Sequence, residues 1–202
     1  MRIGSDKRSP FSDKRLTLYA ALSVSALLGA LFGALCWCSG VGSEQLSGML
    51  DNAQKSFFEE RRSGDISALL LGTLSGTGFY LLAAFLLGFS ALAQPFELIL
   101  PFLRGMTCGV MMTVSCGGVF DKSSLMKTAA VFPGVLAALV ITVLASREAV
   151  LLSDRLFGIC FSKGLTEGLR DRIRLYVVRF IGLLAAVSVT AFIDLLLAML
   201  LL

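Results

Sequence analysis

Four charged residues lie inside or at the edge of long apolar runs, where their side chains could do chemistry that the surrounding residues could not. They are Glu97, Arg104, Arg179 and Asp194. A charge held in hydrocarbon is costly and often marks the path of an ion or a substrate. The four charges therefore suggest a polar path across a membrane, with Arg179 and Asp194 as intramembrane polar residues.

Asp194 lies deeper in an apolar run than any other acidic residue. Pairing with Lys122 or Lys127 near the outer face would give it a structural role. A proton or ion relay would need further polar partners, and the sequence does not identify them.

The residues that usually carry out catalysis or bind metals are missing or isolated. The chain has no histidine, which removes the commonest general base. Cys36 and Cys38 form a CxC motif without a second pair of ligands, which argues against a zinc site. Cys108, Cys116 and Cys160 lie in or beside apolar runs, where thiols behave as small hydrophobic groups. We therefore predict no enzymatic activity, no cofactor and no metal.

The composition places these residues in a membrane protein. Hydrophobic residues make up 56% of the 202 positions and the mean hydropathy is +0.83, which is more apolar surface than a soluble domain of this size could bury. The net charge of +4 is spread over residues that flank the apolar runs instead of forming one basic face. This pattern argues against nucleic acid and predicts the lipid bilayer as the main partner.

Five apolar runs have about the length that a membrane-spanning helix needs. The first has a basic leader, but it is too long for a typical signal peptide and we predict that it is retained. Together the runs predict an all-α, polytopic membrane bundle that forms one domain over residues 16–202. The predicted spans are about 16–38, 66–92, 102–120, 125–146 and 177–202.

The distribution of Lys and Arg predicts the orientation. Twelve of these residues fall on the side of the N-terminus and five on the other side, so the positive-inside rule predicts an N-terminus inside and a C-terminus outside. Residues 1–15 then form a cytoplasmic basic tail. Residues 39–65 form an external segment, either an amphipathic helix on the outer surface or a solvated connector. Residues 147–176 form a cytoplasmic amphipathic segment whose arginines would meet anionic lipid or, alternatively, a soluble partner.

Two prolines interrupt the apolar sequence between the second and third spans. Pro95 and Pro101 should each end or restart a helix, so we predict a structural turn at the inner membrane surface. Glu97 and Arg104 would then stay hydrated at the rim of the bilayer. The alternative is that both side chains line a polar cavity.

Glycines spaced one helical turn apart predict where helices approach closely. Three such pairs predict tight internal packing, and they leave the oligomeric state open. Pro133 and Gly134 predict a kink in the fourth span. The glycine pairs are Gly29 and Gly33, Gly72 and Gly76, and Gly105 and Gly109.

The segment FYLLAAFLLGFSALAQPFELILPFLRGMTCGVMM resembles the SpoIIM-type stage II sporulation protein M family of integral membrane proteins. The likeness lies in the glycine after a leucine run, the short hydrophobic turn, and the FLRG entry into a glycine-rich third span. The five-span layout over residues 16–202 is also similar. The broader family often has a histidine and an acidic residue after the proline of the fourth span, whereas VFPGVLAAL has neither.

The resemblance implies a non-enzymatic scaffold of the sporulation engulfment machinery in the cell membrane. It would hold peptidoglycan-remodelling partners, such as extracytoplasmic peptidoglycan hydrolases, at the mother-cell membrane. Residues 39–65 and the turn at 121–124 would face those partners. The alternative function is a small-solute transporter, or the membrane subunit of one, with the four charged residues as its polar path.

Overall fold

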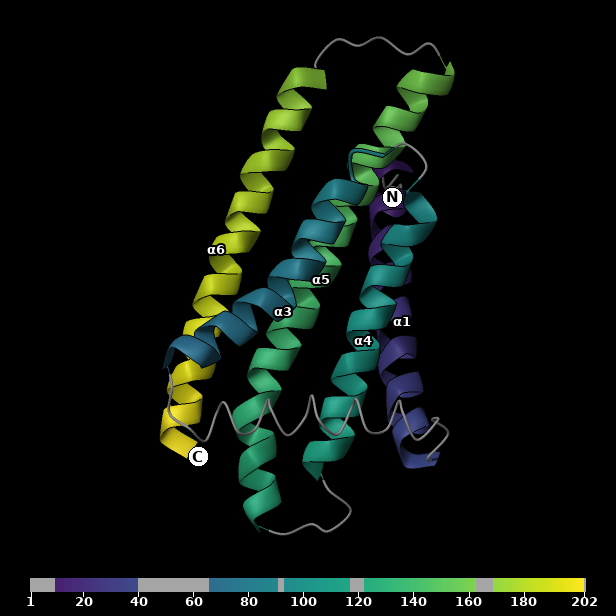
Figure 1. Cartoon of the computed structure of the whole chain (residues 1–202). Coiled ribbons are helices and arrows are strands. Elements are labelled where there is room, and N and C mark those ends of the chain that lie inside the picture. The colour runs from purple at the N-terminus through teal and green to yellow at the C-terminus, as the bar shows by residue number, and fades with distance from the viewer. Residues whose placement is uncertain (1–9, 40–65, 91–92, 117–121, 163–168, 202) are drawn as a thin grey trace, which may run out of the picture.

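The chain folds into a bundle of helices (Figure 1). The computed structural model describes residues 10–39, 66–90, 93–116, 122–162 and 169–201. In this part of the chain there are five helices and no strand, which confirms the predicted all-α fold. The helices are α1 (Pro10–Ser39), α3 (Ile66–Leu87), α4 (Gln94–Cys116), α5 (Lys122–Ser162) and α6 (Leu169–Leu201).

Each of the five helices contains a stretch long and apolar enough to cross a bilayer, as a multi-pass membrane protein requires. Many large apolar side chains are also exposed, among them Leu71 at 72% and Phe79 at 68%. Water would not tolerate so much exposed apolar surface, whereas lipid would. The candidate spans are Leu16–Ser39, Leu70–Leu87, Gln94–Thr113, Phe132–Ile159 and Leu169–Leu197.

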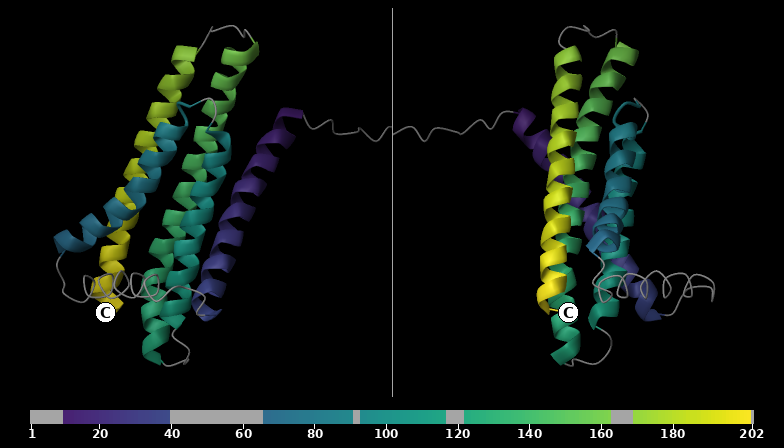
Figure 2. Two further views of the ribbon diagram at one scale, coloured as in Figure 1. Left: turned by 45° about the vertical axis from the view of Figure 1, so that its right-hand side comes forward. Right: turned by 60° about the vertical axis from the view of Figure 1, so that its left-hand side comes forward.

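The helices alternate in direction, so α1 begins and α6 ends at opposite ends of the bundle (Figures 1 and 2). The long helix α5 contacts each of the other four helices. On one side, α1 packs mainly against α4. On the other side, α3 packs against both α5 and α6.

The apolar core lies between α3, α5 and α6. Its buried members include Leu81, Ile141 and Val187, one from each helix. Aromatic rings fill the end of this core nearest the turn after α3, where the rings of Phe85 and Tyr176 stack with centroids 5.5 Å apart. This cluster packs α3 against α6 at that end.

The predicted turn at the two prolines differs from the structure. Helix α4 begins at Gln94, which places Pro95 in its first turn, where a missing amide hydrogen costs nothing. Pro101 lies inside the same helix and is buried, so it does not restart a helix. The third span is therefore Gln94–Thr113, earlier than the predicted 102–120. Neighbouring helices in a membrane bundle can compensate for the hydrogen bond that an internal proline removes.

The predicted surface helix at 147–176 also differs from the structure. Residues 147–162 continue α5, and residues 169–176 form the first turns of α6. The 41 residues of α5 extend over about 60 Å, twice the hydrocarbon thickness of about 30 Å. Helix α5 is therefore longer than one crossing of the bilayer needs, and Leu156 of α5 and Ile173 of α6 still pack against the apolar core at this end.

Two further predictions lie outside the described residues. The external segment 39–65 is described only at Ser39, so neither the surface helix nor the connector is tested. Of the basic tail, residues 1–9 lie outside the described part, and residues 10–15 form the first turns of α1.

Candidate functional site

Two of the predicted glycine pairs lie face to face where α1 meets α4. A methyl group on Gly29 or Gly33 would overlap the backbone carbonyl of Phe102 or Met106. Reciprocally, a methyl group on Gly105 or Gly109 would overlap the carbonyl of Ala26 or Ala30. We call these four glycines the α1–α4 seam. Because a rigid backbone blocks each position, the seam fixes α4 and the charged side chains that it carries.

The third glycine pair does not mediate contact in this structure. Gly72 and Gly76 lie on the exposed face of α3, and a methyl group on Gly76 would have no atom within 4 Å. The close approach that their spacing predicts is therefore not seen within the described bundle.

Glu97 is the most deeply buried charged residue in the part of the chain that the structure describes. Its side chain has 0% exposure, and neither carboxylate oxygen has a hydrogen-bond partner among the described residues. The sequence predicted a hydrated position at the membrane rim, but α4 starts at Gln94 and turns Glu97 toward the bundle interior. The alternative, in which Glu97 and Arg104 line a polar cavity, stays a prediction.

Arg104 reaches from α4 to α3 near the middle of the bundle. Its guanidinium group donates a hydrogen bond of 3.0 Å to the hydroxyl of Thr77 and lies 5.2 Å from the ring centre of Tyr80. The hydrogen bond to the hydroxyl and the cation–π contact with the ring stabilise a guanidinium charge that hydrocarbon would not solvate. Glu97 and Arg104 form no ion pair in the described part of the chain, although they lie on the same helix.

Asp194 is buried between α6, α3 and α5, with 2% of its surface exposed. The hydroxyl of Thr73 donates a 3.3 Å hydrogen bond to its carboxylate. A methyl group added at Gly134 would lie 2.9 Å from that carboxylate, so the glycine makes room for it. Thr73 and Thr77 are one helical turn apart, which means that one face of α3 serves both Asp194 and Arg104.

The predicted partners of Asp194 are Lys122 and Lys127. Lys122 and Lys127 belong to α5, but the positions of their side chains lie outside the described residues.

Gly134 lies beside Pro133, and α5 continues through both residues as one helix. Gly134 therefore gives Asp194 space, and the predicted kink stays a prediction.

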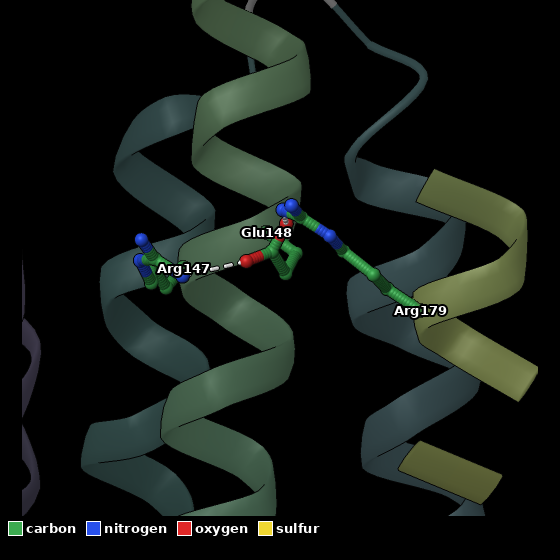
Figure 3. Close-up of polar contacts among 3 residues, drawn as sticks. All are labelled: Arg147, Glu148 and Arg179. Atoms are coloured by element: carbon green, nitrogen blue, oxygen red, sulfur yellow. Dashed lines mark hydrogen bonds and ion pairs between the residues drawn. The ribbon is translucent and has the colours of Figure 1, made fainter. Parts of the chain in front are cut away.

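Arg179 belongs to a group of three charges that the sequence did not predict (Figure 3). Glu148 of α5 lies between Arg147 and Arg179, pairing with Arg147 at 2.7 Å and also with Arg179 of α6. The guanidinium of Arg147 also stacks over the ring of Tyr19, 4.3 Å from its centre. This group joins α5 to both α6 and α1. Glu148 was missed because it lies among the charges that follow the fourth apolar run.

The short turn between α3 and α4 is held by hydroxyl groups. Tyr176 donates hydrogen bonds to the carbonyls of Phe85, at 3.0 Å, and Ala84, at 3.3 Å. Ser153 of α5 donates a 2.8 Å bond to the carbonyl of Ser90. A methyl group on Gly88 would overlap the Tyr176 hydroxyl and lie 3.1 Å from the backbone of Ala149, so the glycine allows this close approach. The turn is thus tied to both long helices.

A cleft of about 740 Å³ opens beside the three charges, lined by residues of α1, α4, α5 and α6. Arg147, Glu148 and Arg179 form part of its wall. In the left-hand view of Figure 2, the first turns of α1 lean away from the other helices at this end of the bundle. Among the described residues, no group of three His, Cys, Asp or Glu side chains could hold a metal ion.

The chain was compared with protein-family models, curated proteins and solved structures. None of them matches it. The resemblance to the sporulation family therefore stays a prediction that depends on the quoted motifs alone.

Proposed function

We propose that this chain is a non-enzymatic membrane scaffold that presents its extracytoplasmic segment, residues 39–65, to peptidoglycan-remodelling partners. The proposal follows the resemblance to the engulfment proteins of sporulating cells. The chain would then be a multi-pass protein of the cell membrane.

The observation that best supports the proposal is the α1–α4 seam. Segment 39–65 begins where α1 ends, and Gly33 holds that last part of α1 directly against the backbone of α4. A helix packed in this way cannot slide or tilt without steric overlap. The segment would therefore start from a fixed base, as a partner-binding element needs.

Capture of partners from sporulating cells tests this function. We expect the full-length chain to pull down peptidoglycan hydrolases, and we expect capture to be lost when residues 39–65 are replaced by a Gly/Ser linker of equal length. A control with Arg170→Gln and Arg174→Gln alters the opposite end of the bundle and should capture normally. Equal capture by the linker variant would refute the proposal.

Transport is the second candidate, because buried polar side chains follow one another along the bundle. Asp194 contacts Thr73, and Arg104 contacts Thr77 one turn further along α3. Glu97 is buried two turns beyond Arg104 on α4. A series of charged side chains along the interior of a membrane protein is typical of substrate and ion pathways.

A swelling assay separates the two functions. Proteoliposomes holding the wild-type chain are placed in iso-osmotic glycine, lactate or potassium phosphate, and compared with Glu97→Gln and Asp194→Asn. The scaffold proposal predicts no swelling above that of empty liposomes for any of the three chains. Swelling that only the wild type supports, with hydrolase capture unchanged, would favour transport.

A further inference from the structure

The cleft beside Glu148 carries more positive than negative charge. Four arginines and two acidic residues line it, and they belong to α5 and α6. These six residues are Arg147, Glu148, Asp154, Arg155, Arg172 and Arg179.

Two of the four arginines are not engaged by the acidic residues. Glu148 is shared by Arg147 and Arg179. Arg155 and Arg172 are exposed, come from the two facing helices, and form no ion pair within the described ranges. A planar guanidinium offers a forked pair of donors that matches the oxygens of a phosphate group.

Arg147, which lines the cleft, also has a buried donor without an acceptor among the described residues. The Nε atom of Arg147 is buried and has no hydrogen-bond partner among the described residues. The same guanidinium is held in place by the ring of Tyr19 and by Glu148. A preorganised side chain with a free donor loses little entropy when an anion binds.

The cleft lies where the apolar part of the bundle ends. Residues 128–146 of α5 carry no charge, and Arg147 follows them directly. Likewise, the uncharged residues 180–193 of α6 begin just after Arg179. Leu18, Leu151 and Leu175 line the cleft beside the charged groups. A ligand here would meet cations on one side and apolar side chains on the other.

We propose that this cleft binds the phosphate group of an anionic phospholipid, in the leaflet that the charge distribution predicts to be cytoplasmic. Arg155 and Arg172 contact the phosphate oxygens from opposite sides, and the leucines contact the first part of the acyl chains. Basic pockets between membrane helices favour such headgroups. A soluble phosphate compound shares the phosphate chemistry but would not use the apolar side of the cleft. The proposal does not depend on the scaffold function.

Lipid binding to the purified full-length chain tests the proposal. The chain in detergent is titrated with phosphatidylglycerol, with phosphatidylcholine, and with inorganic phosphate, and bound lipid is counted by native mass spectrometry. We expect saturable binding of phosphatidylglycerol that survives dilution, with phosphatidylcholine binding more weakly. We expect Arg155→Gln together with Arg172→Gln to weaken phosphatidylglycerol binding on the order of 30-fold, given the contribution of each arginine at a membrane surface.

The matched control is Arg170→Gln with Arg174→Gln, which removes the same charge from exposed positions of α6 outside the cleft. It should change the affinity less than about threefold, because only nonspecific attraction is lost. Helical circular dichroism should be unchanged in both double variants, since all four side chains are exposed. Equal weakening by the two variants, or no saturable phosphatidylglycerol binding, would overturn the proposal. Binding of inorganic phosphate as tight as that of the lipid would overturn the lipid assignment and leave a soluble phosphate compound as the ligand.

Discussion

Glu97 and Glu148 differ in their surroundings: Glu97 is fully buried, whereas Glu148 is only partly buried. Glu148 has two arginine partners, whereas neither carboxylate oxygen of Glu97 has a partner among the described residues. A buried polar group without a partner is a cost to folding, and a paired one becomes a cost when its partner is removed. Opposite effects should therefore follow from the same chemical change at the two positions.

We expect Glu97→Gln to leave the thermal midpoint in detergent unchanged or to raise it, because the amide fills the same volume without a charge. We expect Glu148→Gln to lower stability by about 1–2 kcal/mol, since Arg147 and Arg179 lose their shared carboxylate. Thermal unfolding followed by circular dichroism measures both. A clear loss of stability in Glu97→Gln would mean that this carboxylate has a partner outside the described residues.

The hydroxyl of Thr77 should be needed to hold Arg104. Thr77→Val keeps the shape of the side chain but removes the oxygen that accepts the bond from the guanidinium group. We expect a loss of about 0.6 kcal/mol, the average for side-chain hydrogen bonds between membrane helices, and at most about 1.7 kcal/mol. Thr107→Val is the control, because that exposed hydroxyl bonds only to the backbone of its own helix. Similar losses in the two variants would argue against the contact between α3 and α4.

Residue types identified some of these positions but not their partners. A charge within an apolar run is visible in the sequence, so Glu97, Arg104 and Asp194 were predicted as candidates. Their partners Thr73 and Thr77 were not, because isolated threonines are common in membrane helices. Glu148 escaped prediction for a different reason: it follows a predicted span, where charges are ordinary. Only the packing of α5 against α6 gives it a distinct role.

At the scale of the helices, spacing alone does not decide which glycines pack. All three pairs have the same separation, yet the four glycines of the α1–α4 seam meet a neighbouring backbone, whereas a methyl group on Gly76 would meet no atom within 4 Å. Helix ends were also hard to predict. The charges after residue 146 suggested the end of a span, but α5 continues past them and its apolar face packs against α6. The two prolines of α4 led to a wrong prediction of where the third span begins. Pro95 lies in the first turn of the helix and Pro101 lies inside it.

The seam leads to a matched pair of alanine variants. We expect Gly105→Ala to destabilise the bundle by about 2 kcal/mol or more, because the added methyl group would overlap the carbonyl of Ala26, which cannot move freely. Gly76→Ala should stabilise α3 by about 0.5–1 kcal/mol, since it meets no atom and alanine favours the helix. Thermal midpoints of the two variants and the wild type test this. Equal effects in both would contradict the close approach of α1 and α4.

At the scale of the whole molecule, the fold places charged groups in two different settings. The end of the bundle with the cleft gathers arginines that an anionic leaflet would attract, while the interior holds Arg104 and Asp194 in contact with hydroxyl groups of α3. The two settings lie at different depths, so the orientation of the bundle decides which leaflet meets the cleft. The distribution of Lys and Arg predicts the cytoplasmic leaflet.

Labelling of single cysteines tests that orientation. Cys38 is exposed near the end of α1, and the four other cysteines are replaced by alanine. In intact cells, a membrane-impermeant maleimide should label Cys38. With Cys38 also replaced, a cysteine introduced by Arg170→Cys at the start of α6 should be labelled only after the membrane is permeabilised. The reverse pattern would place the cleft in the outer leaflet. Labelling of both positions in intact cells would contradict an odd number of spans between Cys38 and Arg170.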